Sequence, residues 1–297
     1  MVTILIPVYN EAETLSAVIP PIAEFCRQKQ WHLLCVNDGS TDASCRMLAE
    51  LSAVHGFTVL HHKVNRGYGA AMKTGIRAAG TELILTMDAD GQHTIRDCER
   101  LYETLLETDA DMVLGSRKGS ADAGVWRGLG KSIIRRFASL LMPLPVYDIN
   151  SGMRIYRTSI AREALHLLPD TFSFSDTLTL LFVNSRQRVL ETPITVSARR
   201  GGKSTISLQT AFETVMEILN IAVLFNPMKI FLPVALACFA VGIPWGVYIV
   251  SLGHGVSVGS SLLIITGILS FLLGLIAEQL SSIKKAIRPD AGWSRER

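Results

Sequence analysis

The chain has 297 residues, of which 48% are apolar and 19% are charged, and its mean hydropathy is +0.31. These values exclude a disordered chain, a collagen-like repeat and a small disulfide-stabilised scaffold. The net charge of +3 conceals an asymmetry, because residues 1–116 carry 9 basic and 15 acidic side chains whereas residues 117–297 carry 20 and 11. A basic second half with apolar segments indicates an anionic membrane surface or a phosphate-bearing substrate. Because no aromatic residues are interleaved with the basic ones, this half of the chain does not indicate nucleic-acid binding.

The cysteines give no sign of a disulfide framework or a zinc site. They are scattered, without Cys-x-x-Cys spacing, at Cys26, Cys35, Cys45, Cys98 and Cys238. This usage fits a reducing compartment. Because strand-like sequence begins at Val2 without a basic leader or a cleavage site, we expect no signal peptide and a cytosolic N-terminal domain.

The first half of the chain alternates short β-rich runs with amphipathic stretches of helical length. The predicted strands are residues 2–7, 32–36, 57–61, 83–87 and 111–115. The predicted helices between them include residues 14–27, 43–54 and 95–107. This alternation predicts an α/β fold with a doubly wound, mostly parallel sheet. In such sheets ligands bind beyond the carboxyl ends of the strands.

The C-terminal part of the chain has the pattern of a membrane protein. Residues 207–225 have apolar side chains at helical spacing and predict an amphipathic helix in the membrane interface, with a core-facing globular helix as the alternative. Residues 228–250 and 259–281 each carry one charged residue and are long enough to span a bilayer. The linker between them is uncharged, whereas the tail after them is basic. The positive-inside rule therefore predicts that the N-terminal domain and the tail are both cytosolic.

These patterns divide the chain into four parts. We expect a catalytic domain over 1–205, an interfacial helix over 206–226, two transmembrane helices over 227–284 and a basic tail over 285–297.

Two carboxylates, Asp88 and Asp90, come directly after the predicted strand 83–87. Their mutual repulsion is relieved by a divalent cation, and hard oxygen ligands suit Mg²⁺ or Mn²⁺. The alternative is a solvated acidic loop without a metal.

A second acidic strand end follows residues 32–36. Asp38 is a candidate acceptor for hydrogen bonds from a base or a ribose, while Asp42 is predicted to cap the helix that follows. Residues 65–71 partly resemble a dinucleotide fingerprint, but Met72 stands where the third glycine belongs. We interpret the glycines as opening a helix whose backbone approaches a nucleotide.

Four stretches, in this order and spacing, resemble the family 2 glycosyltransferases of the GT-A fold. They are residues 6–11, 37–42, 65–71 and 88–93. The resemblance covers roughly residues 2–205. With the apolar C-terminal segments, the chain resembles the polyprenyl-phosphate glycosyltransferases, the group that includes dolichyl-phosphate mannose synthase. The resemblance implies inverting transfer of a sugar from a UDP- or GDP-linked donor to polyprenyl phosphate, with Mg²⁺ or Mn²⁺ as cofactor.

The resemblance also implies a role for each matching residue. The nucleotide would be bound by Pro7, Tyr9, Glu11, Asp38 and Asp88. The cation would be held by Asp88, Asp90 and Gln92. The catalytic residues would be Asp90, Arg117 and Asp176. Arg117 would meet a donor or acceptor phosphate, with a solvated surface arginine as the alternative.

The acceptor side is implied by three further stretches. A basic loop before the membrane segments would bind phosphate through Arg199, Arg200, Lys203 and Ser204, although Lys-Ser stands where Ser-Lys is usual. Contact with lipid headgroups is the alternative for this loop. Residues 148–154 match at the wall of the acceptor site. Asp176 lies where relatives carry a general base, and it would orient the acceptor, abstract a proton or cap a helix.

Two rival functions stay open. A processive polysaccharide synthase of the same fold would carry a Gln-x-x-Arg-Trp stretch and more spans, neither of which is found. A nucleotide-sugar-binding membrane subunit without catalysis is the other. The partners implied are a nucleotide sugar, polyprenyl phosphate, the bilayer and a second copy of the chain.

Overall fold

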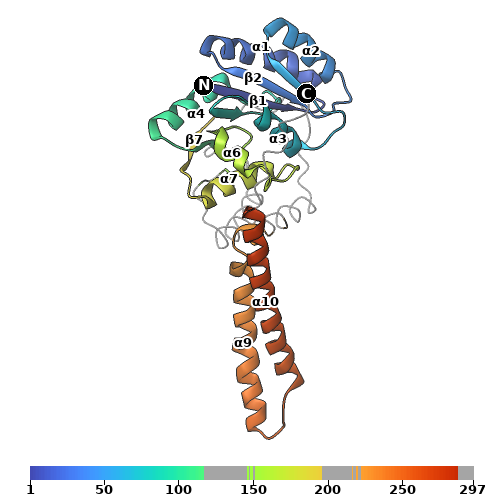
Figure 1. Cartoon of the computed structure of the whole chain (residues 1–297), viewed down its shortest axis with the longest axis vertical. Helices are drawn as coiled ribbons and strands as arrows, with labels where there is room; N and C mark the ends of the chain where they lie inside the picture. The colour runs from blue at the N-terminus through green and yellow to red at the C-terminus, as the bar shows by residue number, and fades with distance from the viewer. Residues whose placement is uncertain are drawn as a thin grey trace. The chain divides into compact units, whose positions relative to one another are not determined.

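The computed structural model describes residues 1–116, 146, 148–149, 151–195, 216, 219 and 222–286. The chain divides into two compact units, an α/β unit and a unit that contains a C-terminal helical hairpin (Figure 1). Arg117, residues 196–205 and the tail beyond residue 286 lie outside the described residues.

The described strands of the α/β unit form a seven-stranded sheet in the order β3-β2-β1-β4-β6-β5-β7. The strands are β1 (Val2–Val8), β2 (His32–Asn37), β3 (Thr58–His61), β4 (Leu83–Thr86), β5 (Met112–Ser116), β6 (Arg154–Arg157) and β7 (Val189–Pro193). Only β6, among these strands, runs antiparallel to its neighbours β4 and β5. The prediction of a mostly parallel α/β sheet is therefore confirmed.

Helices cover both faces of this sheet. They are α1 (Ala12–Lys29), α2 (Ser44–His55), α3 (Tyr68–Ala78), α4 (Ile95–Thr108), α6 (Thr158–Ala164) and α7 (Phe174–Asn184). Successive side chains of β1 point to opposite faces of the sheet. Ile4 joins a buried cluster with α1 and α4, whereas Leu5 packs against Gly75 of α3. Strand β1 is buried on both faces, as expected for a central parallel strand.

The strands that the sequence did not predict lack a strong apolar period. Strand β6 reads Arg-Ile-Tyr-Arg, and β7 carries Glu191 and Thr192. Packing within the sheet stabilises these strands, so local sequence alone does not identify them. Helix α3 begins at Tyr68, within the stretch 65–71 where the sequence predicted that a helix opens.

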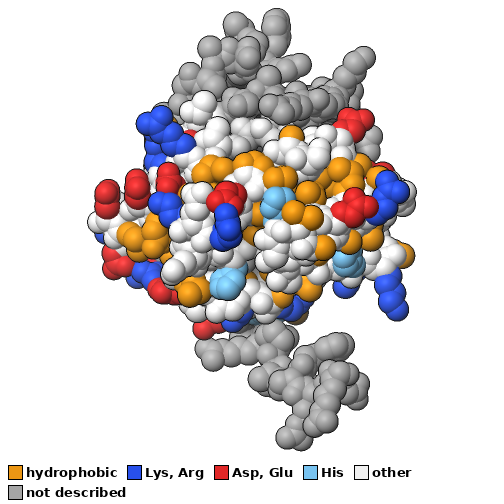
Figure 2. Space-filling model, turned by 90° about the horizontal axis from the view of Figure 1, so that it is seen from above, with side chains coloured by type: hydrophobic (Ala, Val, Ile, Leu, Met, Phe, Trp, Pro, Cys, Tyr) orange, Lys and Arg blue, Asp and Glu red, His pale blue; other side chains and the backbone are white. Residues whose placement is uncertain are grey.

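On the face of the α/β unit drawn in Figure 2, acidic and basic side chains alternate with apolar ones. The charged side chains that the structure describes there form no continuous basic patch.

The hairpin consists of α9 (Met228–Ser251) and α10 (Val258–Ala286). Both helices are long and apolar enough to cross a membrane, with mean hydropathies of 2.1 and 2.3. Only 11% and 22% of their apolar windows are buried, unlike the core helices of soluble proteins. Small residues let the two helices approach closely, as where Gly242 meets Leu263 and Gly267 meets Phe239.

The two spans predicted from the sequence are thus confirmed as helices, and α10 extends five residues beyond the predicted end. Most of the predicted interfacial helix 207–225 lies outside the described residues. Of that stretch, residues 216, 219 and 222–225 are described, and all are helical.

Candidate active site

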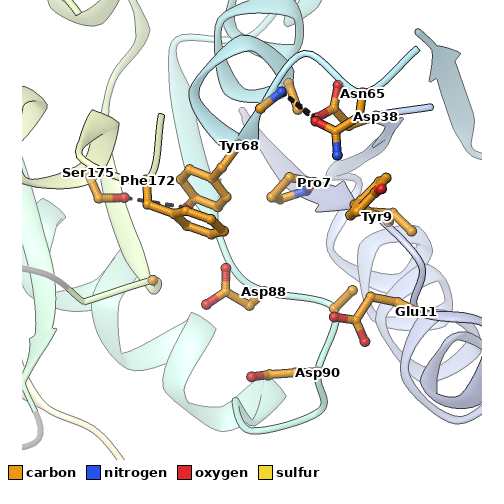
Figure 3. A pocket seen from close by; sticks show the side chains of 15 residues that line it. Pro7, Tyr9, Glu11, Asp38, Asn65, Tyr68, Asp88, Asp90, Phe172 and Ser175 are labelled. Atoms are coloured by element: carbon orange, nitrogen blue, oxygen red, sulfur yellow. Dashed lines mark hydrogen bonds between the residues drawn. The ribbon is translucent and has the colours of Figure 1, made fainter. Parts of the chain in front are cut away.

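A cavity of about 410 Å³ opens beyond the carboxyl ends of β1, β2 and β4 (Figure 3). The parallel register of these strands brings their ends to one edge, so that the segments after Val8, Asn37 and Thr86 converge. The cavity is lined by all five side chains predicted to bind the nucleotide and by Asp90. The sequence therefore located this site correctly, while the role of each residue stays a prediction.

Hydrogen bonds tie the loops after β1 and β2 to each other. The Asn10 side chain accepts from Thr41 N at 2.8 Å, and Glu11 N donates to Ser44 Oγ at 2.9 Å. Asp42 accepts from the first N–H groups of two helices, Ala12 N at 3.1 Å and Ser44 N at 2.9 Å. Burial acts to raise the pKa of Asp42, but these hydrogen bonds outweigh it and lower the pKa. Asp42 thus accepts from the first N–H group of α2, as the capping prediction requires, although Ala43 is the N-cap residue; it does the same for α1.

Asp38 is buried and makes several hydrogen bonds within the protein. Its Oδ1 lies 2.6 Å from His62 Nδ1 and accepts from Arg66 N at 3.0 Å, while Oδ2 accepts from Gly67 N at 2.8 Å. With His62 Nδ1 as donor, Nε2 accepts from Thr74 Oγ1 at 2.9 Å. Asp38 thus shapes the turn before α3 as well as lining the cavity. His62 was missed because nothing local shows that it faces Asp38.

The start of α3 packs against the chain's own backbone at residues 169–170. The N–H groups of Gly69 and Ala70 donate to Asp170 O at 2.9 and 3.3 Å. A β-carbon at Gly69 would lie 2.3 Å from Pro169 O, so only glycine fits there. The close approach at Gly69 is made by the chain's own backbone at 169–170. Gly67 of the same stretch lines the cavity, so the expectation that its backbone approaches a nucleotide stays a prediction.

Asp88 and Asp90 both project into the cavity (Figure 3). Asp88 occupies space that any side chain at Gly152 would take, since a β-carbon there would lie 2.2 Å from Asp88 Oδ2. Asp90 Oδ1 accepts from Gln92 N at 3.1 Å. Gln92 is not among the residues that line the cavity, so its described contribution is to orient Asp90 through its backbone.

The acidic pair fits a cation that arrives with a ligand. Among the described residues, no group of three or more His, Cys, Asp or Glu side chains is placed to hold a metal. Mg²⁺ and similar cations are often bound by one or two carboxylates, with substrate phosphates and waters completing the shell. Asp88 and Asp90 suit that arrangement rather than a permanent site.

On the opposite wall, Asp176 of α7 is half-buried, with its Oδ1 enclosed, and it follows the cavity-lining Ser175. Burial raises the pKa of Asp176 to about 6, with Arg154 acting to lower it and Asp148 to raise it. Its Oδ1 accepts no hydrogen bond from any described group, whereas a helix-capping oxygen would. The described contacts therefore show no capping hydrogen bond at Oδ1, and the role of Asp176 stays a prediction.

Arg154 is fully buried and holds this wall together. Its guanidinium donates to the carbonyl oxygens of Ser151 and Ser175 and to Thr179 Oγ1. It thereby joins β6 to α7. Sequence reasoning placed Arg154 in an acceptor-site stretch but did not find this structural role.

Comparison with known proteins identifies the family. Residues 3–165 match the model of Glycosyl transferase family 2, and residues 226–283 match that of the GtrB C-terminal hairpin. The chain belongs to glycosyl transferase family 2. It is therefore a glycosyltransferase, as the resemblance implied, and its apolar hairpin makes it a membrane protein.

Two curated relatives of this glycosyltransferase are informative. It is 30% identical over 229 residues to polyprenol monophosphomannose synthase of Mycolicibacterium smegmatis, covering 72% of this chain and 84% of that protein. It is 25% identical over 223 residues to dodecaprenyl-phosphate galacturonate synthase of Rhizobium johnstonii, covering 74% of this chain and 65% of that protein.

Solved structures share the fold of this glycosyltransferase at lower identity. Glucosyl-3-phosphoglycerate synthase from Mycobacterium tuberculosis, in complex with Mn²⁺, UDP-glucose and phosphoglyceric acid, is 18% identical with a TM-score of 0.57; the match covers 75% of this chain and 79% of that one. TarS from S. aureus, in complex with UDP, is 16% identical with a TM-score of 0.51, over 75% and 65% of the two chains.

Five predicted phosphate-contacting residues of this glycosyltransferase lie outside the described residues. They are Arg117, Arg199, Arg200, Lys203 and Ser204. Their roles stay predictions.

Proposed function

We propose that this glycosyltransferase transfers a sugar from a UDP- or GDP-linked donor to the phosphate of a polyprenol at the cytosolic membrane face, with inversion. The observation that carries the proposal is a cavity with paired carboxylates in a family 2 domain that precedes an apolar hairpin. The names of the curated relatives, both polyprenyl-phosphate sugar synthases, support the acceptor.

The nucleoside would bind at the side of the cavity formed by the loops after β1 and β2. Tyr9 is 44% exposed and offers an aromatic ring there, beside Pro7. Asp38 and Glu11 supply acceptor oxygens for hydroxyl and base N–H groups. Because the loops are tied by protein hydrogen bonds, this side is organised before the ligand arrives.

Asp90, with Asp88, would hold a divalent cation, either Mg²⁺ or Mn²⁺, together with the donor diphosphate. When bound, such a cation supplies positive charge that neutralises the departing nucleoside diphosphate. The chain's own contribution is to fix the two carboxylates, through the Gln92 backbone for Asp90 and the space at Gly152 for Asp88.

In the reaction, a phosphate oxygen of the lipid forms a bond to the anomeric carbon while the bond from that carbon to the diphosphate oxygen breaks. A phosphate acceptor is already ionised at neutral pH and needs no general base. Asp176 therefore acts in positioning rather than in proton abstraction. Arg117 and the basic loop with Arg199, Arg200, Lys203 and Ser204 would hold the acceptor phosphate.

The hairpin places the two ends of the chain on one side of the bilayer, because two spans return the chain to its starting face. The basic tail argues that this face is cytosolic. The water-soluble donor and the lipid phosphate then meet at headgroup depth, where the predicted interfacial helix would lie.

The test is release of nucleoside diphosphate by the purified full chain in detergent or bilayers, with Mg²⁺ or Mn²⁺. A panel of UDP- and GDP-linked sugars is supplied, each with and without polyprenyl phosphate. Release that requires the lipid phosphate supports the proposal and identifies the donor. Release without the lipid indicates another acceptor, and binding without release indicates a non-catalytic subunit.

A further inference from the structure

We infer that Phe172, stacked on Tyr68, is the platform on which the donor's sugar ring lies. The inference rests on the proposed function and specifies the part of the site that recognises the sugar. Phe172 is 82% exposed, the highest value among the large hydrophobic side chains that the structure describes. Phe172 and Tyr68 both line the cavity, and their rings are stacked at 5.6 Å with an interplanar angle of 18° (Figure 3). An exposed aromatic ring in a cavity wall indicates a ligand that covers it.

The platform is held rigidly. Tyr68 is the first residue of α3, and the next two N–H groups of that helix donate to Asp170 O, two residues before Phe172. Lys73 adds an ion pair with the Asp170 carboxylate at 2.7 Å. The Tyr68 hydroxyl accepts from Ser175 Oγ at 3.4 Å. Both rings therefore belong to segments that are fixed to each other before any ligand binds.

The polar groups beside the two rings indicate which class of ligand can bind there. Ser175 and Asp88 also line the cavity, so hydroxyl and carboxylate groups border the two rings. An aromatic face bordered by hydroxyl and carboxylate groups matches a pyranose, which has an apolar face of C–H groups and a rim of hydroxyls.

A prenyl phosphate fits this wall less well. The polar end of such a lipid is anionic, whereas Asp88 and Asp176 on this wall are acidic. Of the described cations near this wall, Arg154 is buried and directs its N–H groups to carbonyl oxygens and a threonine hydroxyl, while Lys73 is paired with Asp170. Charge therefore favours the neutral sugar over the isoprenoid phosphate as the occupant.

The experiment compares binding of two ligands to the full chain in detergent by calorimetry, without any acceptor. The ligands are the nucleotide sugar that the wild type binds from the UDP and GDP panel and the matching nucleoside diphosphate. We expect Phe172→Ala to weaken binding of the nucleotide sugar about tenfold and to leave the nucleoside diphosphate unchanged. Phe172→Tyr should keep both affinities. Val54→Ala, at an exposed position of α2 outside the cavity lining, is the matched control.

Several outcomes would overturn the platform. They are unchanged binding of the nucleotide sugar by Phe172→Ala, equal weakening of both ligands, and a wild type that binds no nucleotide sugar more tightly than the nucleoside diphosphate. A rise confined to the KM for polyprenyl phosphate would assign Phe172 to the isoprenoid instead. Failure of the proposed function is a separate result, because it is seen in the wild type as nucleoside diphosphate release that does not depend on the lipid.

Discussion

The two walls of the cavity differ in how their polar groups are satisfied. On the wall formed by the loops after β1 and β2, Asp38 and Asp42 accept hydrogen bonds from neighbouring loop and helix N–H groups. On the wall formed by α7 and the segment before it, Asp176 Oδ1 has no described partner and Phe172 is exposed. The carboxylates Asp38 and Asp42 of the first wall have hydrogen-bond partners within the protein. The second wall presents a carboxylate oxygen and an aromatic ring that a ligand can contact. We therefore expect the second wall to determine the selectivity for sugar and acceptor.

The largest expected effect is on the carboxylate between these walls. Asp90→Asn keeps the shape and the Gln92 N–H contact but removes the negative charge, so we expect transfer to fall about 1,000-fold. The measurement is nucleoside diphosphate release under saturating substrates, with the melting temperature as a control for folding. Normal turnover in this variant would remove Asp90 from the proposed cation site.

The second wall should be the more fragile, because its fold depends on one buried cation. Arg154→Met removes the buried N–H groups that donate to the Ser151 carbonyl oxygen and to Thr179 Oγ1. We therefore expect a loss of about 3 kcal/mol in the free energy of unfolding. Arg157→Met, at the other end of β6, is the matched control. Arg157 pairs with Glu82, Asp109 and Asp111 in a partly exposed position, so its loss should cost about 1 kcal/mol. Equal losses would contradict the comparison.

Asp176 should make stability depend on pH in an unusual direction. Burial raises its pKa to about 6, above the ordinary 3.8, so the folded chain binds this proton more tightly than the unfolded chain does. Stability from this group is complete below about pH 4 and is lost as pH rises through 6, by about 2–3 kcal/mol. Asp176→Asn should therefore be more stable than the wild type at pH 7.5, with the difference vanishing near pH 4. Denaturant unfolding at the two pH values measures it, and a variant less stable at pH 7.5 would refute it.

The smallest expected effect is on the KM for the nucleotide sugar, for a substitution in the wall formed by the loops after β1 and β2. His62→Leu removes both the contact to Asp38 and the contact to Thr74, which loosens the turn before α3. We expect the KM for the nucleotide sugar to rise about fivefold, with the KM for polyprenyl phosphate unchanged. His62→Asn, whose Nδ2 replaces Nδ1, should restore most of the affinity. His55→Ala, at an exposed position at the end of α2, serves as the control.

The sequence predicted the strand ends beside the cavity better than the wall formed by α7 and the segment before it, for a physical reason. Strands β1, β2 and β4 are continuous apolar runs, and in a parallel sheet their ends must meet at one edge, which places Asp38, Asp88 and Asp90 together. The other wall is built by contacts between residues far apart in the chain. Tyr68 and Phe172, for example, are joined only when residues 169–170 pack against the start of α3.

The same separation in sequence explains why the contact between the start of α3 and residues 169–170 was not predicted. A glycine before a helix predicts a close approach, but the identity of the approaching group is decided by the tertiary fold. In this chain the group is Asp170 O, about a hundred residues away. Arg154 was underestimated for a similar reason, since an arginine in a short polar strand gives no local sign of complete burial.

The contact at Gly69 also determines where the enzyme can be modified. Lengthening the chain near residues 169–170 would separate the backbone that fills the space beside Gly69 and would displace both aromatic rings together. By contrast, a β-carbon at Gly56, in the turn between α2 and β3, would meet nothing within 4 Å. A fluorescent label or an affinity tag is therefore better inserted at the turn of Gly56, where the ring pair and the paired carboxylates keep their positions.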